Sequence, residues 1–106
     1  MTFRIRAAAV ILLAASIAGP AFAQASGAAN YKARCVMCHG EDGLASTPVA
    51  KSMKVLSFKA PEMVKASDAQ LFASTKNGKN KMPAYKGRFT DEQIKEIVSY
   101  IRTLQK

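Results

Sequence analysis

The chain has 106 residues, of which 49% are hydrophobic, and it carries a formal net charge of +9 at pH 7. This length fits a single domain, and the basic balance favours an acidic protein surface, anionic lipid or nucleic acid as partner. Two cysteines and one histidine in total argue against a structural zinc site, which normally takes four cysteine or histidine ligands.

Residues 1–23 have the features of a secretory signal peptide. A short segment with two arginines precedes an apolar run over residues 7–18, and small residues at 21 and 23 fit a signal-peptidase site. The run is shorter than the ~20 residues that a membrane span needs, so we predict cleavage before Gln24 rather than an uncleaved anchor. The mature domain, residues 24–106, is then expected in the periplasm without stable membrane insertion, and export argues against a nucleic-acid partner.

Residues 25–37 are expected to form the first helix of the mature chain. Gly27, Tyr31 and Cys35 are spaced by four and therefore share one face of that helix. A glycine on this face lets another helix approach closely, and Tyr31 offers a ring beside the contact. The alternative is that the glycine only marks a fraying terminus.

The helix leads into the motif C-x-x-C-H over residues 35–39, the attachment signature of a c-type haem. Two intervening residues place the sulfurs of Cys35 and Cys38 roughly one helical turn apart, where each can add to one vinyl group on the porphyrin edge. His39 then lies under the ring and can offer a neutral imidazole nitrogen to the iron. One haem per chain would also stabilise a domain whose own core is thin.

Two other uses of the cysteine pair are less well supported. A thioredoxin-like redox pair sits in a strand–helix setting, but no strand pattern precedes Cys35. A structural disulfide would usually close a longer loop than the four-residue one from Cys35 to Cys38.

The segment after the haem motif is rich in turn residues, and Pro48 follows His39 by nine positions. A ligating histidine usually donates its second ring N–H to a carboxylate or a backbone carbonyl. The Pro48 carbonyl is a candidate acceptor, and a simple turn proline is the alternative. Farther along, Val55, Leu56 and Phe58 are apolar and are expected to line the haem pocket.

Two further helices are indicated before the last loop. Pro61 can occupy the first turn of a short helix. Ser67 and Gln70 have the spacing of a capping box, which predicts a helix that runs to about Asn77. Gly78 can supply the left-handed residue that ends it.

The last helix has the clearest pattern in the chain. Thr90 and Gln93 form a second capping box. Apolar residues then recur at helical spacing on one face, namely Ile94, Ile97, Val98, Ile101 and Leu104. Because no segment has a convincing strand pattern, the sequence predicts an all-α fold.

Methionine is the remaining candidate for the second axial ligand of the iron, because the single histidine is already used and His/Met ligation raises the potential; Met63 and Met53 stay as alternatives to the methionine favoured below. The mature chain offers Met37, Met53, Met63 and Met82. Met37 lies between the two tethers and cannot reach the far face of the haem. Met53 and Met63 fall in an apolar stretch, where they are expected to fill the core. Met82 lies in a loop beside the stiff Pro83 and is the predicted ligand.

Together these motifs resemble the class I cytochromes c, the small monohaem type, and most closely bacterial cytochrome c6-like or c551-like proteins. The pattern G-x-x-x-[FY]-x-x-x-C-x-x-C-H begins at Gly27, and residues 77–83 are similar to the methionine loop of the family. The resemblance implies three to five helices wrapped around one covalently bound haem. It also implies that the last helix crosses the first through Ile97, Tyr100 and Ile101.

The same resemblance implies which residues surround the haem without ligating iron: Pro48, Tyr31, Phe58 and Tyr85. In the family a proline carbonyl accepts the N–H of the axial histidine, which supports Pro48 in that role. The pattern implies no catalytic residue.

The predicted function is a soluble, monomeric, exported one-electron carrier between redox partner proteins. Alternatives are a haem enzyme or sensor of the peroxidase type, against which Met82 argues, and an electron-entry subunit of a larger dehydrogenase or oxidase. Basic residues cluster around Met82 and predict docking to acidic patches on the partner, although they could be merely solvated. They are Lys76, Lys79, Lys81, Lys86 and Arg88.

Overall fold

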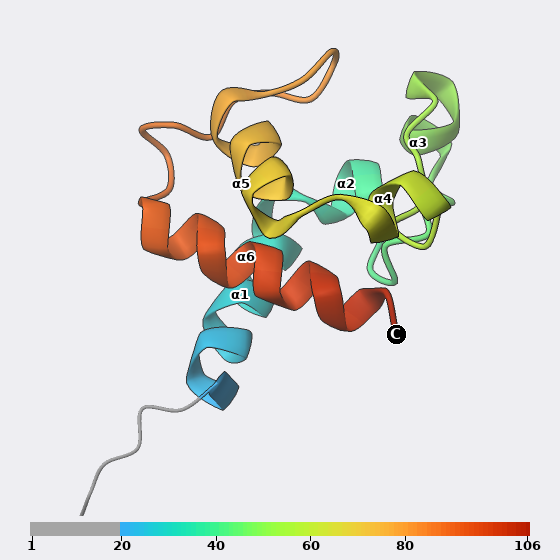
Figure 1. Cartoon of the computed structure of the whole chain (residues 1–106). Coiled ribbons are helices and arrows are strands. Elements are labelled where there is room, and N and C mark those ends of the chain that lie inside the picture. The colour runs from blue at the N-terminus through green and yellow to red at the C-terminus, as the bar shows by residue number, and fades with distance from the viewer. Residues whose placement is uncertain (1–19) are drawn as a thin grey trace, which may run out of the picture.

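The structure is a computed structural model, and it describes residues 20–106. Within this range the chain forms six helices and no strand, only two isolated bridges. The helices are α1 (Pro20–Arg34), α2 (Val36–His39), α3 (Pro48–Met53), α4 (Pro61–Lys65), α5 (Asp68–Asn77) and α6 (Asp91–Leu104) (Figure 1). The all-α prediction is confirmed. The predicted signal peptide lies almost entirely outside the described residues, and none of the described helices is both long and apolar enough for a membrane span.

The crossing of α1 and α6 is the main helix–helix contact, and Figure 1 shows α6 running across α1. It is close because Gly27 has no side chain: a Cβ there would collide with the Glu96 carbonyl oxygen and lie 2.7 Å from the Glu96 carbonyl carbon. One turn farther along α1, the Tyr31 ring packs against Tyr100, with ring centroids 5.2 Å apart. The predicted role of Gly27 and Tyr31 in this crossing is therefore confirmed.

Local sequence signals place the beginnings of the later helices correctly. Ser67 caps α5 and Thr90 caps α6, and both capping boxes form, with Gln70 and Gln93 as the reciprocal partners. α4 begins at Pro61, as predicted.

The helices before α4 differ from the prediction. The expected helix over residues 25–37 instead begins at Pro20 and ends at Arg34, and Cys35 separates it from the short α2. The sequence did not predict α3, because Pro48 was considered as a hydrogen-bond acceptor or a turn residue and not as the start of a helix. It is instead the first residue of a helix that Thr47 caps. These two short helices raise the total to six, above the expected three to five.

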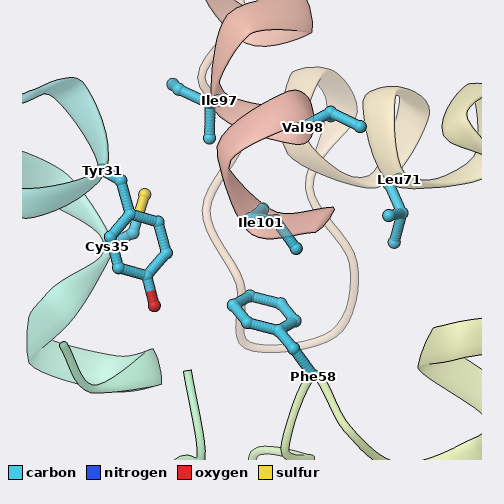
Figure 2. Packing of buried hydrophobic residues seen from close by; sticks show 7 residues of the cluster. All are labelled: Tyr31, Cys35, Phe58, Leu71, Ile97, Val98 and Ile101. Carbon is cyan, nitrogen blue, oxygen red and sulfur yellow. The ribbon is translucent and has the colours of Figure 1, made fainter. Parts of the chain in front are cut away.

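The core lies where α1, α5, α6 and the loop before α4 meet (Figure 2). Its buried members are Tyr31, Cys35, Phe58, Leu71, Ile97, Val98 and Ile101. Burial of one large apolar side chain contributes roughly 1.5–3 kcal/mol. The α6 stripe predicted from periodicity is buried, except that Leu104 is only half-buried. Of the three residues expected to line the haem pocket, Phe58 is buried in this core, Val55 is half-buried and Leu56 is 51% exposed.

Candidate functional site

One enclosed, mostly apolar cavity brings together the predicted haem residues. Its lining comes from α1, α2, α4, α5 and α6, from the loop before α4 and from the loop between α5 and α6. It includes the first cysteine, the histidine and the predicted methionine ligand, with aromatic and aliphatic residues between them: Tyr31, Cys35, His39, Phe58, Met63, Leu71, Ser74, Thr75, Met82, Ile97 and Ile101. Pro48, Cys38 and Tyr85 lie outside this lining.

Cys35 is held at the junction of α1 and α2. Its backbone N–H donates to the Tyr31 carbonyl at 2.8 Å, and its own carbonyl accepts from the His39 N–H at 2.9 Å. The pKa of the Cys35 thiol is raised to about 11. Burial is the larger cause, and the charge of the nearby Cys38 is the smaller one. A redox-active C-x-x-C pair has a lowered thiol pKa, so this environment argues against a thioredoxin-like role.

His39 ends α2 and directs its ring into the core. The imidazole stacks on Phe58, with ring centroids 4.7 Å apart and an interplanar angle of 13°. Burial lowers the pKa of His39. A lowered pKa keeps the ring neutral at pH 7, which is the form that binds iron.

The predicted hydrogen bond from His39 to the Pro48 carbonyl is not formed in this structure, because the buried Nδ1 atom has no hydrogen-bond partner. Thr47 instead links α3 to the haem motif. Its Oγ1 accepts from the Ala50 N–H at 3.0 Å and donates to the Met37 carbonyl at 2.9 Å. Sequence reasoning missed this residue, although a threonine directly before a helical proline is an N-cap signal.

The four methionines considered as axial ligands differ in whether they line the cavity. Met37 is 73% exposed, and Met53 is absent from the cavity lining, whereas Met63 and Met82 both line it. Met82 is fixed by a tight turn: its N–H donates to the Lys79 carbonyl at 2.9 Å, and its carbonyl accepts from the Lys79 N–H at 3.2 Å.

Gly78 makes that turn possible. It has a φ of +76°, and a Cβ there would lie 2.8 Å from the Met82 carbonyl oxygen and 3.0 Å from the Ala84 nitrogen. The predicted helix-ending role of Gly78 is confirmed, since it follows the last residue of α5. The backbone of the methionine loop therefore packs directly on the end of α5.

Two tyrosines fix the surroundings of the cavity through backbone carbonyls. The buried Tyr31 hydroxyl donates to the Gly40 carbonyl at 2.6 Å, just beyond the haem motif. Burial raises the pKa of both Tyr31 and Tyr85, so both hydroxyls stay protonated donors at neutral pH. The Tyr85 hydroxyl donates to the Arg34 carbonyl at 3.1 Å.

Two hydroxyl residues on α5, Ser74 and Thr75, also line the cavity, and the sequence did not single them out. Thr75 is 4% exposed, and its Oγ1 donates to the Leu71 carbonyl at 2.8 Å. Its hydrogen-bonding capacity is thus met within its own helix. A periodicity argument cannot find such residues, because a serine or threonine on a helix looks like a solvent-facing position.

Four of the five residues in the predicted basic cluster are exposed, and the fifth forms an ion pair within the chain. Lys79, Lys81, Lys86 and Arg88 are exposed. Lys76 is instead paired with Asp91 at 3.1 Å, with its side chain 30% exposed. Its charge is therefore partly compensated within the chain.

Comparison with known proteins identifies the family. Residues 22–101 match a family model described as cytochrome c oxidase, cbb3-type, subunit III. Cytochrome c6 from Nostoc sp. is 33% identical, over 87% of this chain and 82% of its own length. Cytochrome c6 from Parathermosynechococcus lividus is 35% identical, over 73% of this chain and 85% of its own length. The solved c-type cytochrome KustC0563 superposes with a TM-score of 0.69 at 28% identity, over 76% of this chain and 98% of that protein.

The donors that line the cavity fit a haem, since a neutral imidazole and a thioether are the axial pair of cytochromes c, and a cysteine lies beside them. The family match, the relatives and the structural neighbour agree with this chemistry. The chain therefore belongs to the cytochrome c family, as a small class I c-type cytochrome that binds haem c covalently and carries electrons rather than acting as an enzyme.

Proposed function

We propose that the protein is a soluble, monomeric, exported electron shuttle of the periplasm. Cys35 and Cys38 would form the thioether tethers, and His39 and Met82 the axial ligands. The observation that carries this proposal is that His39 and Met82 line the same partly enclosed cavity as Cys35. When bound, the haem iron supplies a reversible one-electron change between its ferrous and ferric states.

The protein residues have three tasks in such a carrier. Burial keeps His39 neutral, so that its lone pair is available. The tight turn from Lys79 to Met82 limits the movement of the thioether, which favours the same coordination in both oxidation states. The apolar lining excludes water, and His/Met ligation raises the reduction potential.

An optical and ligand-binding experiment tests the proposal. The oxidised protein should show the weak absorption band of a methionine thioether bound to ferric iron, with one haem per chain. The reduced protein should not bind carbon monoxide at neutral pH, because Met82 occupies the sixth position. Rapid carbon monoxide binding by the unaltered protein would instead support the haem sensor or peroxidase alternative.

Docking is proposed to use the exposed basic residues of the methionine loop, and its partner to present an acidic patch. The supporting observation is that Lys79, Lys81 and Lys86 are exposed within a segment that contains no acidic residue. We expect Lys81→Glu to slow reduction of hexacyanoferrate(III), an anionic oxidant, by roughly threefold to tenfold at low ionic strength. Stopped-flow rates over a range of salt concentrations would measure this effect.

Lys106→Glu is the matched control, because it makes the same charge change at the exposed end of the chain beyond α6 (Figure 1). Its rate should remain close to that of the unaltered protein. A cationic cobalt(III) complex should show the opposite salt dependence. Rates with hexacyanoferrate(III) that do not depend on ionic strength would exclude steering by this loop.

A second candidate is an electron-entry subunit of a larger oxidase. The observation that favours it is the family description, which names subunit III of a cbb3-type cytochrome c oxidase. Co-purification of the protein with a membrane-bound oxidase under mild detergent conditions would support this role. Recovery of the native protein only as a free monomer would support the shuttle.

A further inference from the structure

Tyr85 joins the methionine loop to the residue directly before the first haem cysteine. Its hydroxyl donates to the Arg34 carbonyl at 3.1 Å, across 51 positions of the chain. The side chain is buried, with 8% of its surface exposed. A partly buried hydrogen bond therefore connects the segment that carries Met82 with the segment that carries Cys35.

The Arg34 carbonyl is available because the helical pattern changes at this point. α1 ends at Arg34. The Cys38 N–H, which would reach Arg34 in a continuous helix, donates to the Cys35 carbonyl at 3.3 Å. The last carbonyls of a helix need partners from outside it, and Tyr85 supplies one.

The other end of the Tyr85 contact is equally well fixed. Its backbone N–H donates to the Thr75 carbonyl on α5 at 3.0 Å. Its ring stacks on Phe89 with centroids 5.6 Å apart, and the Arg88 guanidinium lies 5.9 Å from the ring. Only two residues, one of them the rigid Pro83, separate Tyr85 from Met82, so a shift of Tyr85 would move the methionine.

We propose that Tyr85 is a positioning residue that holds Met82 against the haem side of the cavity through its hydrogen bond to the Arg34 carbonyl. The inference rests on the proposed ligation by Met82. In the absence of this hydrogen bond, the loop from Lys79 to Tyr85 opens more easily. An external ligand then competes more effectively with the thioether.

The test is Tyr85→Phe in the haem-loaded, oxidised protein. The substitution keeps the ring and its stacking on Phe89 but removes the hydroxyl. We expect the apparent affinity for added imidazole to rise by about 3- to 30-fold, because the loss of a partly buried hydrogen bond shifts the equilibrium by that order. Titration with imidazole, followed by loss of the thioether-to-iron band, would measure the change.

Tyr100→Phe is the matched control. The Tyr100 ring is half-buried against Tyr31, and its hydroxyl makes no hydrogen bond within the described residues. Its imidazole affinity should equal that of the unaltered protein even if its melting temperature falls. A readout of ligand exchange thus separates positioning of Met82 from a general loss of stability.

Two negative results would have different meanings. An unchanged imidazole affinity in Tyr85→Phe, together with a large increase in Met82→Ala, would overturn the role of Tyr85 and leave the axial pair intact. If Met82→Ala itself left the spectrum and the imidazole affinity unchanged, the proposed ligation by Met82 would be wrong.

Discussion

Replacing Met82 with alanine should lower the reduction potential and open the iron to external ligands. The thioether stabilises ferrous iron, so its loss should lower the potential by on the order of 0.1–0.3 V, within the ~0.8 V range that axial ligands set. The thioether-to-iron band should disappear, and the reduced protein should now bind carbon monoxide. Spectroelectrochemical titration and carbon monoxide difference spectra measure the two effects.

Met63→Leu is the matched control for this experiment, because Met63 also lines the cavity and leucine has nearly the same volume. The band, the potential and the lack of carbon monoxide binding should all persist in this variant. Loss of the band in Met63→Leu but not in Met82→Ala would assign the sixth ligand to Met63 and contradict the proposal.

Gly27→Ala should destabilise the domain, although helix propensity alone predicts the opposite. In an open helix, alanine is more stable than glycine by roughly 0.5–1 kcal/mol. At Gly27, however, the new Cβ would collide with the backbone of Glu96, which cannot rotate away as a side chain would. We expect the free energy of unfolding to fall by about 1–3 kcal/mol, which corresponds to a decrease of roughly 5–20 °C in melting temperature.

The sign of the Gly27→Ala effect is the decisive measurement. Thermal unfolding of the haem-loaded protein should be compared with that of Ala29→Gly, an exposed position on the same helix. In that control the free energy of unfolding should fall by no more than about 1 kcal/mol, because glycine has a lower helix propensity than alanine. A more stable Gly27→Ala protein would show that α1 and α6 do not cross as closely as the structure indicates.

Features encoded by neighbouring residues were predictable from the sequence. The capping boxes that begin at Ser67 and Thr90 formed as expected, because each needs only residues three positions apart. The α6 stripe was also correct, since helical periodicity depends only on one segment. Gly27 was a candidate for a close helix crossing because it shares a helix face with Tyr31, although a fraying helix end was an equal alternative until the structure placed Glu96 against it.

Features that depend on the fold were not predictable in the same way. The Tyr85 hydrogen bond joins residues 51 positions apart, so no local pattern reveals its acceptor. The orientation of the His39 ring decides whether Pro48 can accept its N–H, and the structure stacks that ring on Phe58. Leu56 is apolar but 51% exposed, and apolar character alone does not predict that exposure.

The environment of Cys35 has a consequence for the maturation of the protein. In the folded chain this thiol is only 8% exposed, and its pKa is raised to about 11. It is therefore neither open to an attaching enzyme nor appreciably ionised at neutral pH. Covalent loading should accordingly take place on the unfolded polypeptide, with the domain closing around a cofactor that is already bonded to it.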